Sequence, residues 1–146
     1  MGEKTMTGYP SVDKPWMKHY SEATLNYPLP RQSVYSYMEE KVSEYLDDTA
    51  IVYFGKKIKY STLLENIKRT AAGFTAIGVK AGDIVAIALP NIPENIYCLY
   101  ALNYIGAIAD MIDLRSKGDT LQRYLEMSHA KVAVVCDMFA ENTLSV

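Results

Sequence analysis

Residues 84–89 form an unbroken run of six apolar residues, Ile-Val-Ala-Ile-Ala-Leu. A strand with one solvated face alternates apolar and polar residues, so a run without alternation is typical of a strand that is covered on both faces. Such strands occur in parallel sheets with helices packed on each side. The run therefore predicts a parallel α/β arrangement from residue 84 onward.

Helical and strand patterns alternate after this run. The predicted helices span 93–105 and 121–128, and the predicted strands span 107–112 and 132–136. The order is β-α-β-α-β, and right-handed crossovers would place the three strands in one parallel sheet with flanking helices. Only ten residues follow Cys136, where this class of fold continues with a returning helix. The chain is therefore expected to be an incomplete part of a larger domain.

A helix and a β-hairpin are predicted ahead of this sheet. Ser33 is a suitable N-cap for an amphipathic helix that runs to Leu46. Residues 49–54 and 57–60 have strand character, and Gly55 at the first turn position predicts a type II′ hairpin. Three lysines of the hairpin could bind phosphate, but on a two-stranded ribbon they are more typical of a solvated face that protects an edge. These lysines are Lys56, Lys57 and Lys59.

The helix that follows the hairpin has a recognisable start and end. Ser61 is its predicted N-cap, and Gly78 is placed to adopt the left-handed conformation that ends a helix. Val79 would then pack back on Phe74, as in a Schellman motif. Asp119 or Thr120 is the predicted N-cap of the helix at 121–128.

Residues 1–32 differ in character from the rest of the chain. They hold four of the six prolines and several aromatic residues, including Trp16. We expect an extended arm that lies against a surface and buries its rings. The predicted organisation is thus this arm at 1–32, followed by an incomplete α/β subdomain at 33–146.

Composition excludes several classes of protein. With 49% hydrophobic residues and a net charge of −2, the chain is neither disordered nor a typical nucleic-acid binder. Its most apolar stretch, 97–112, is shorter than the roughly 20 residues needed to span a bilayer, so no transmembrane segment is predicted. Cys98 and Cys136 are far apart, which predicts buried free thiols and a cytoplasmic protein.

Four polar residues follow the predicted strands at their carboxyl ends, where open parallel sheets bind ligands. They are Asn91, Asp113, Arg115 and Asp137. One interpretation makes them the rim of a pocket. The other makes Asn91 and Asp137 turn residues or helix caps, and Asp113 and Arg115 a solvated ion pair. The sequence contains no glycine-rich phosphate loop after the first strand, no partner for His19 or His129 at metal-ligand spacing, and no catalytic constellation.

Seven segments carry, in order, the pattern of a known enzyme family. They are 14–20 (Lys-Pro-Trp-Met-Lys-His-Tyr), 50–60, 61–64, 72–86, 89–91, 106–108 and 128–132. Together they resemble the N-terminal portion of the adenylate-forming superfamily, in particular long-chain fatty acyl-CoA ligases. Residues 33–146 would then be an incomplete N-terminal subdomain of such an enzyme.

The resemblance implies a role in a larger enzyme. Members activate a carboxylic acid with ATP and pass the acyl group to coenzyme A. Their phosphate loop and catalytic lysine follow this region, so the resemblance implies a front section that is inactive alone, without catalytic or metal-binding residues. ATP, Mg²⁺ and CoA would serve the parent enzyme, as would the fatty acid. In some relatives the loop after the second parallel strand lies near the CoA entrance, which makes Asp113 and Arg115 candidates, although 108–114 lacks the prolines of the family pattern.

Two alternatives stay open. The chain could be a stand-alone, non-enzymatic binding or receiver-like module, or part of an aryl- or amino-acid-activating enzyme. A severed front section would expose core surface and form a homodimer or otherwise self-associate. The parent enzyme is expected in the cytoplasm, with peripheral membrane attachment as a further option.

Overall fold

The computed structural model describes residues 6–140, and the chain divides into two compact units, Met1–Arg31 and Gln32–Val146. The first unit contains three short helical segments, α1 (Pro10–Asp13), η1 (Pro15–His19) and α2 (Glu22–Leu25). This differs from a continuously extended arm, because prolines begin the first two segments and Ser21 caps the third by accepting from the backbone N–H of Thr24. Taken by itself, this unit leaves its aromatic rings exposed, because it is too small to bury them.

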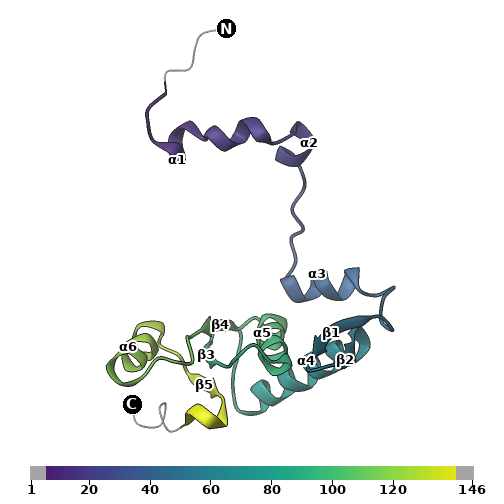
Figure 1. Cartoon of the computed structure of the whole chain (residues 1–146), viewed down its shortest axis with the longest axis vertical. Helices are drawn as coiled ribbons and strands as arrows, with labels where there is room; N and C mark the ends of the chain where they lie inside the picture. The colour runs from purple at the N-terminus through teal and green to yellow at the C-terminus, as the bar shows by residue number, and fades with distance from the viewer. Residues whose placement is uncertain (1–5, 141–146) are drawn as a thin grey trace. The chain divides into compact units, whose positions relative to one another are not determined.

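The second unit holds the remaining elements (Figure 1). They are α3 (Val34–Lys41), β1 (Thr49–Tyr53), β2 (Lys56–Lys59), α4 (Tyr60–Ala76), β3 (Ile84–Ala88), α5 (Pro93–Ile105), β4 (Ile108–Met111), α6 (Gly118–Ser128), β5 (Val132–Val135) and η2 (Asp137–Phe139).

The three predicted parallel strands form one sheet in the order β4-β3-β5. Val85 of the central strand aligns with Ala109 on one side and with Val132 on the other. The chain therefore moves from β3 to one neighbour and then crosses to the other, which places successive right-handed crossover helices on opposite faces. Figure 1 shows α6 on one side of the sheet and α4 and α5 on the other. The predicted mixed α/β fold is confirmed.

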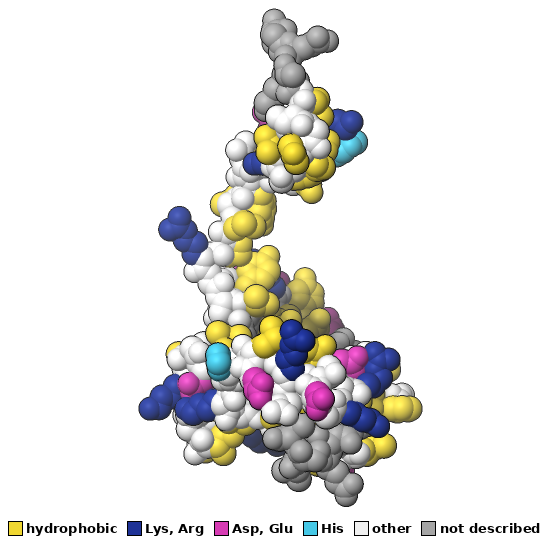
Figure 2. Space-filling model, turned by 90° about the vertical axis from the view of Figure 1, so that its left-hand side faces the viewer, with side chains coloured by type: hydrophobic (Ala, Val, Ile, Leu, Met, Phe, Trp, Pro, Cys, Tyr) yellow, Lys and Arg dark blue, Asp and Glu magenta, His cyan; other side chains and the backbone are white. Residues whose placement is uncertain are grey.

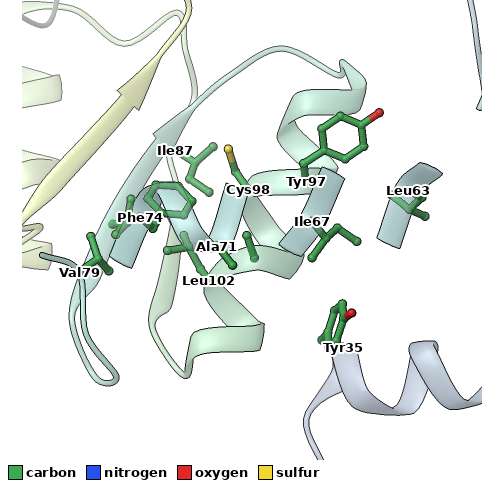
Figure 3. Close-up of a cluster of buried hydrophobic side chains, with 12 residues drawn as sticks. Tyr35, Leu63, Ile67, Ala71, Phe74, Val79, Ile87, Tyr97, Cys98 and Leu102 are labelled. Carbon is green, nitrogen blue, oxygen red and sulfur yellow. The ribbon is translucent and has the colours of Figure 1, made fainter. Parts of the chain in front are cut away.

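The main core lies between the sheet and the helix pair α4–α5. Ile67 of α4, Leu102 of α5 and Ile87 of β3 belong to one cluster of buried side chains (Figure 3). All three side chains are fully buried. Val85 and Ile87 are buried on one face of β3, and Ala86 and Ala88 are buried on the other. Burial on both faces explains why the strand carries no alternating polar residues, because α5 and α6 both contact β3.

The predicted Schellman motif at the end of α4 is confirmed. Gly78 has a φ of 89°, its N–H donates to the carbonyl of Thr75 at 3.0 Å, and the N–H of Val79 donates to that of Phe74 at 3.0 Å. The start of α4 differs from the prediction. Ser61 lies inside the helix, and the backbone N–H groups of Tyr60 and Ser61 donate to the carbonyls of Asp48 and Leu46 instead of to a capping side chain.

This arrangement explains why α3 is shorter than its apolar pattern suggests. Ser33 caps it as predicted and accepts from the N–H of Ser36. The helix ends at Lys41, and two tight turns then bring the carbonyls of Leu46 and Asp48 to the first turn of α4. The chain therefore ends α3 early, and the carbonyls that follow it accept from the first backbone amides of the longer helix α4, which have no partner within that helix.

The hairpin turn is of type I′ and not of the predicted type II′. Tyr53 pairs with Lys56, so the two turn residues are Phe54 and Gly55, with φ of 47° and 79°. Positive φ at both central residues defines the I′ turn, whose twist matches that of the strands. The prediction was wrong by one residue because it read Phe54 as the end of the strand.

Candidate functional site

The carboxyl edge of the parallel sheet gathers the polar residues that follow the strands. Asn91 follows β3, Asp113 follows β4 and Asp137 follows β5. The structure does not bring them into one pocket. Asn91 lines a hollow between β1 and the start of α5, whereas Asp113 lines another hollow beside α6. Asp137 begins η2, where its carboxylate accepts from the N–H of Met138 at 2.8 Å.

Asp113 and Arg115 form a closed ion pair within one turn. Arg115 Nη2 lies 2.6 Å from Asp113 Oδ2, and Nε and the backbone N–H of Arg115 also donate to the carboxylate. The hydrogen bonds from Arg115 lower the pKa of Asp113 to about 2. Both side chains are exposed, so the pair lies at the protein surface.

The hollow beside α6 has a volume of about 480 Å³. It is lined by Asp110, Met111, Ile112, Asp113, Tyr124, Met127 and Ser128. Tyr124 and Met127 reach it because they lie three residues apart on one face of α6, which is anchored by the buried Leu121. Figure 2 views the side of the molecule that carries α6, where basic and acidic side chains are interspersed.

Sequence reasoning identified Asp113 at this hollow and missed the other lining residues. Asp110 was inside a predicted strand, and the face of α6 that meets the sheet depends on the helix start. That helix begins at Gly118, and neither Asp119 nor Thr120 caps it by a side-chain hydrogen bond. The sequence feature that could have indicated the hollow is Asp110, a charged residue in an otherwise apolar strand.

The turn between β3 and α5 is closed by hydrogen bonds and offers few amides to a ligand. Pro93 is the first helical residue and has no N–H, and the N–H of Ile92 donates to the carbonyl of Pro90 at 2.8 Å. Asn95 Nδ2 donates to the carbonyls of Leu89 and Pro90 at 3.4 and 3.2 Å. These contacts hold the strand end against the helix.

The other reactive groups are two thiols, of which Cys136 Sγ donates to Asp137 Oδ1 at 3.3 Å. Cys98 and Cys136 are free thiols, and burial raises the pKa of Cys98 to about 11. Within residues 6–140, no three His, Cys, Asp or Glu side chains are grouped so that they could hold a metal ion. The helices in that range are all too short or too polar to cross a membrane.

Comparisons with known proteins agree on one family. The family model for AMP-binding enzymes matches residues 38–145. A long-chain-fatty-acid–CoA ligase from Bacillus subtilis is 27% identical over 126 residues, which is 86% of this chain and 22% of that protein. A crotonobetaine/carnitine–CoA ligase from Salmonella typhimurium is 32% identical over 113 residues, 74% of this chain and 22% of that protein.

Solved structures give the same result. The N-terminal subdomain of Klebsiella oxytoca NpsA, in complex with anthranilyl-AMSN, superposes with a TM-score of 0.69 at 26% identity. That match covers 73% of this chain and 28% of NpsA's. The chain thus spans about a fifth of the length of the curated relatives it matches, 22% in each case. Because the family model covers well over half of the residues, this chain belongs to the AMP-binding enzyme family.

Proposed function

We propose that this chain is the N-terminal section of an ATP-dependent fatty acid–CoA ligase, which adenylates a carboxylate and then forms a thioester with CoA. We propose a fatty acid as the substrate because of one observation. The match to the Bacillus ligase, at 126 residues, is longer than the whole unit Gln32–Val146, so it includes part of Met1–Arg31. The general family model begins only at residue 38. The similarity to a fatty-acid enzyme therefore extends into the arm.

The described residues do not fit the triphosphate of ATP. The turn after β3 has no glycine and begins its helix with Pro93, so its amides cannot surround phosphate oxygens. No step of the reaction is therefore assigned to residues 6–140. Their proposed role is to build one wing of the α/β core, with Mg²⁺ and the nucleotide held by a different part of the enzyme.

The direct test is the catalytic competence of the 146-residue chain. Purified alone, it is expected to show no fatty-acid-dependent exchange between ATP and pyrophosphate. The coding sequence downstream of Val146 is expected to encode a Thr/Ser/Gly-rich loop, whose amides and hydroxyls can hold phosphates. Robust exchange by the chain alone, or a stop codon directly after Val146, would contradict the proposal.

Asp113 and Arg115 are proposed to border the CoA entrance of the full enzyme. The supporting observation is their exposed position at the carboxyl edge of the sheet, next to the hollow beside α6. In the full-length enzyme, Arg115→Ala should raise the KM for CoA severalfold and leave ATP–pyrophosphate exchange unchanged. Arg123→Ala, on α6, is the matched control. Equal KM values for CoA in both variants and the parent would exclude this role.

An aryl-activating enzyme is the second candidate. The observation in its favour is the 26% identity to NpsA, whose N-terminal subdomain was solved with anthranilyl-AMSN. The two candidates differ in the carboxylate that drives exchange in the full-length enzyme. Palmitate should support it under the first proposal, and anthranilate or benzoate under the second.

The isolated chain is proposed to self-associate through its exposed apolar surface. Met111 of edge strand β4, with Tyr124 and Met127 of α6, lines the hollow and is exposed, and Ile108 of β4 is exposed as well. Light scattering should report a dimer or larger species, and Met111→Glu should reduce it. The two free thiols support a cytoplasmic location for the parent enzyme.

A further inference from the structure

The tip of the β1–β2 hairpin combines backbone strain with an unusual residue. A type I′ turn favours Asn, Asp or Gly at both central positions, because both have positive φ. Phe54 occupies the first of them with a φ of 47°, a conformation that is rare for a bulky side chain. Backbone strain of this kind is concentrated at functional sites.

Burial of the Phe54 side chain does not offset the backbone strain at this position. Phe54 is 93% exposed, and its ring packs edge-to-face on Tyr53, with ring centroids 4.6 Å apart. Val52, two residues before Phe54 in the chain, is 64% exposed. The hairpin therefore presents two large apolar side chains beside its turn, where they contribute little to the core.

Acidic and basic residues are found at opposite ends of the hairpin. Lys56 and Lys57 follow the turn directly as the first two residues of β2, and neither forms an ion pair with any residue in the described range 6–140. The third lysine, Lys59, lies at the opposite end of β2, where its Nζ is 2.8 Å from Asp47 Oδ1. The acidic residues are thus at the base of the hairpin and the unpaired lysines are at its tip, in a chain whose net charge is −2.

We propose that this tip is a docking site for an anionic lipid bilayer. A projecting aromatic side chain can enter the interfacial layer, while lysines beside it keep their ammonium groups at the lipid phosphates. Charge complementarity identifies the occupant, because an apolar protein groove would leave Lys56 and Lys57 uncompensated. The inference concerns the hairpin alone and holds whichever carboxylate the parent enzyme activates.

Binding of the full 146-residue chain to sedimenting vesicles tests the proposal. We expect binding to vesicles that contain phosphatidylglycerol and none to pure phosphatidylcholine, with loss of binding at high salt. Neutralising Lys56→Gln or Lys57→Gln should each lower the partition coefficient about fivefold. Phe54→Asn should lower it about tenfold. This variant is expected to fold, because Asn-Gly is the preferred I′ pair.

Two matched controls lie elsewhere in the same unit. Ile77→Asn removes a side chain that is 62% exposed at the end of α4, and Lys117→Gln removes an exposed lysine that precedes α6. Neither should change vesicle binding. If the controls weaken binding as much as the hairpin variants do, the attraction is a general property of the surface and the proposal is wrong.

A fluorescent reporter identifies the surface that binds. Trp16 is the only tryptophan, so Trp16→Phe with Phe54→Trp places a single indole at the hairpin tip. Its emission should shift to the blue with anionic vesicles and be quenched by brominated lipid. Sedimentation with vesicles and no spectral shift would assign binding to another surface. A shift that depends on protein concentration without lipid would assign the tip to a second copy of the chain. Either result, or the absence of sedimentation at low salt, overturns the proposal.

Discussion

The backbone N–H of Tyr35 donates to Asn103 Oδ1 at 2.8 Å, which joins the first turn of α3 to the end of α5 across 68 residues of sequence. Tyr35 is fully buried, its hydroxyl donates to Glu39, and Glu39 accepts from Lys68 of α4. One side-chain oxygen thus satisfies an amide that no helical hydrogen bond can reach. Three helices are held together at this point.

Replacing Asn103 should therefore destabilise the unit. Asn103→Ala leaves a buried N–H without its acceptor, which costs about 1–3 kcal/mol of unfolding free energy. Asn66→Ala is the control, because the Asn66 side chain accepts from the exposed Arg69 side chain and its loss should cost less than about 0.5 kcal/mol. Urea denaturation measures both. Similar midpoints for the two variants would show that the Tyr35–Asn103 bond has no net stabilising effect.

Two glycines, one inside α4 and one just after its end, should respond in opposite directions to alanine. Gly73 lies inside α4 with open space where a Cβ would be, so Gly73→Ala should stabilise by about 0.5–1 kcal/mol. Gly78 has a φ of 89°, so Gly78→Ala should destabilise by about 1–2 kcal/mol. Thermal unfolding of the pair gives the sign of each change. A stabilising Gly78→Ala would be incompatible with the left-handed end of α4.

The two thiols should react at very different rates. Burial raises the pKa of Cys98 to about 11, so at pH 8 about one thiol in a thousand is ionised, and the side chain is also shielded. Cys136 is half-buried after β5. A thiol reagent should modify one cysteine in the folded chain and two in urea. Cys136→Ser should abolish the native reaction, and Cys98→Ala should leave it unchanged.

The Asp113–Arg115 pair should give a measurable acid dependence. Arg115 lowers the pKa of Asp113 from 3.8 to about 2, so the folded chain binds this proton less tightly than the unfolded chain. The stabilisation is complete above the ordinary pKa and is lost as the pH falls through about 2. In an NMR titration, Arg115→Ala should move the midpoint of Asp113 back toward 3.8, whereas Arg123→Ala should not. An unmoved midpoint in Arg115→Ala would assign the low pKa to another cause.

The sequence by itself determined those features whose physical cause is local. The apolar run of β3 predicts a covered central strand, and the Ser33 cap and the Schellman end at Gly78 each depend on a few adjacent residues. Resemblance in seven ordered segments was enough to identify the family that the comparisons show. Local rules fail at Phe54, which occupies a turn position that its residue type disfavours.

Only the tertiary structure decided which distant residues meet. Asn91 and Asp113 follow neighbouring strands, yet they line different hollows because β1 lies beside one and α6 beside the other. The first amides of α4 are satisfied by carbonyls of the turn after α3, so Ser61 is not needed as a cap. Such partners are chosen by packing across the chain, and residue patterns within one element carry no information about them.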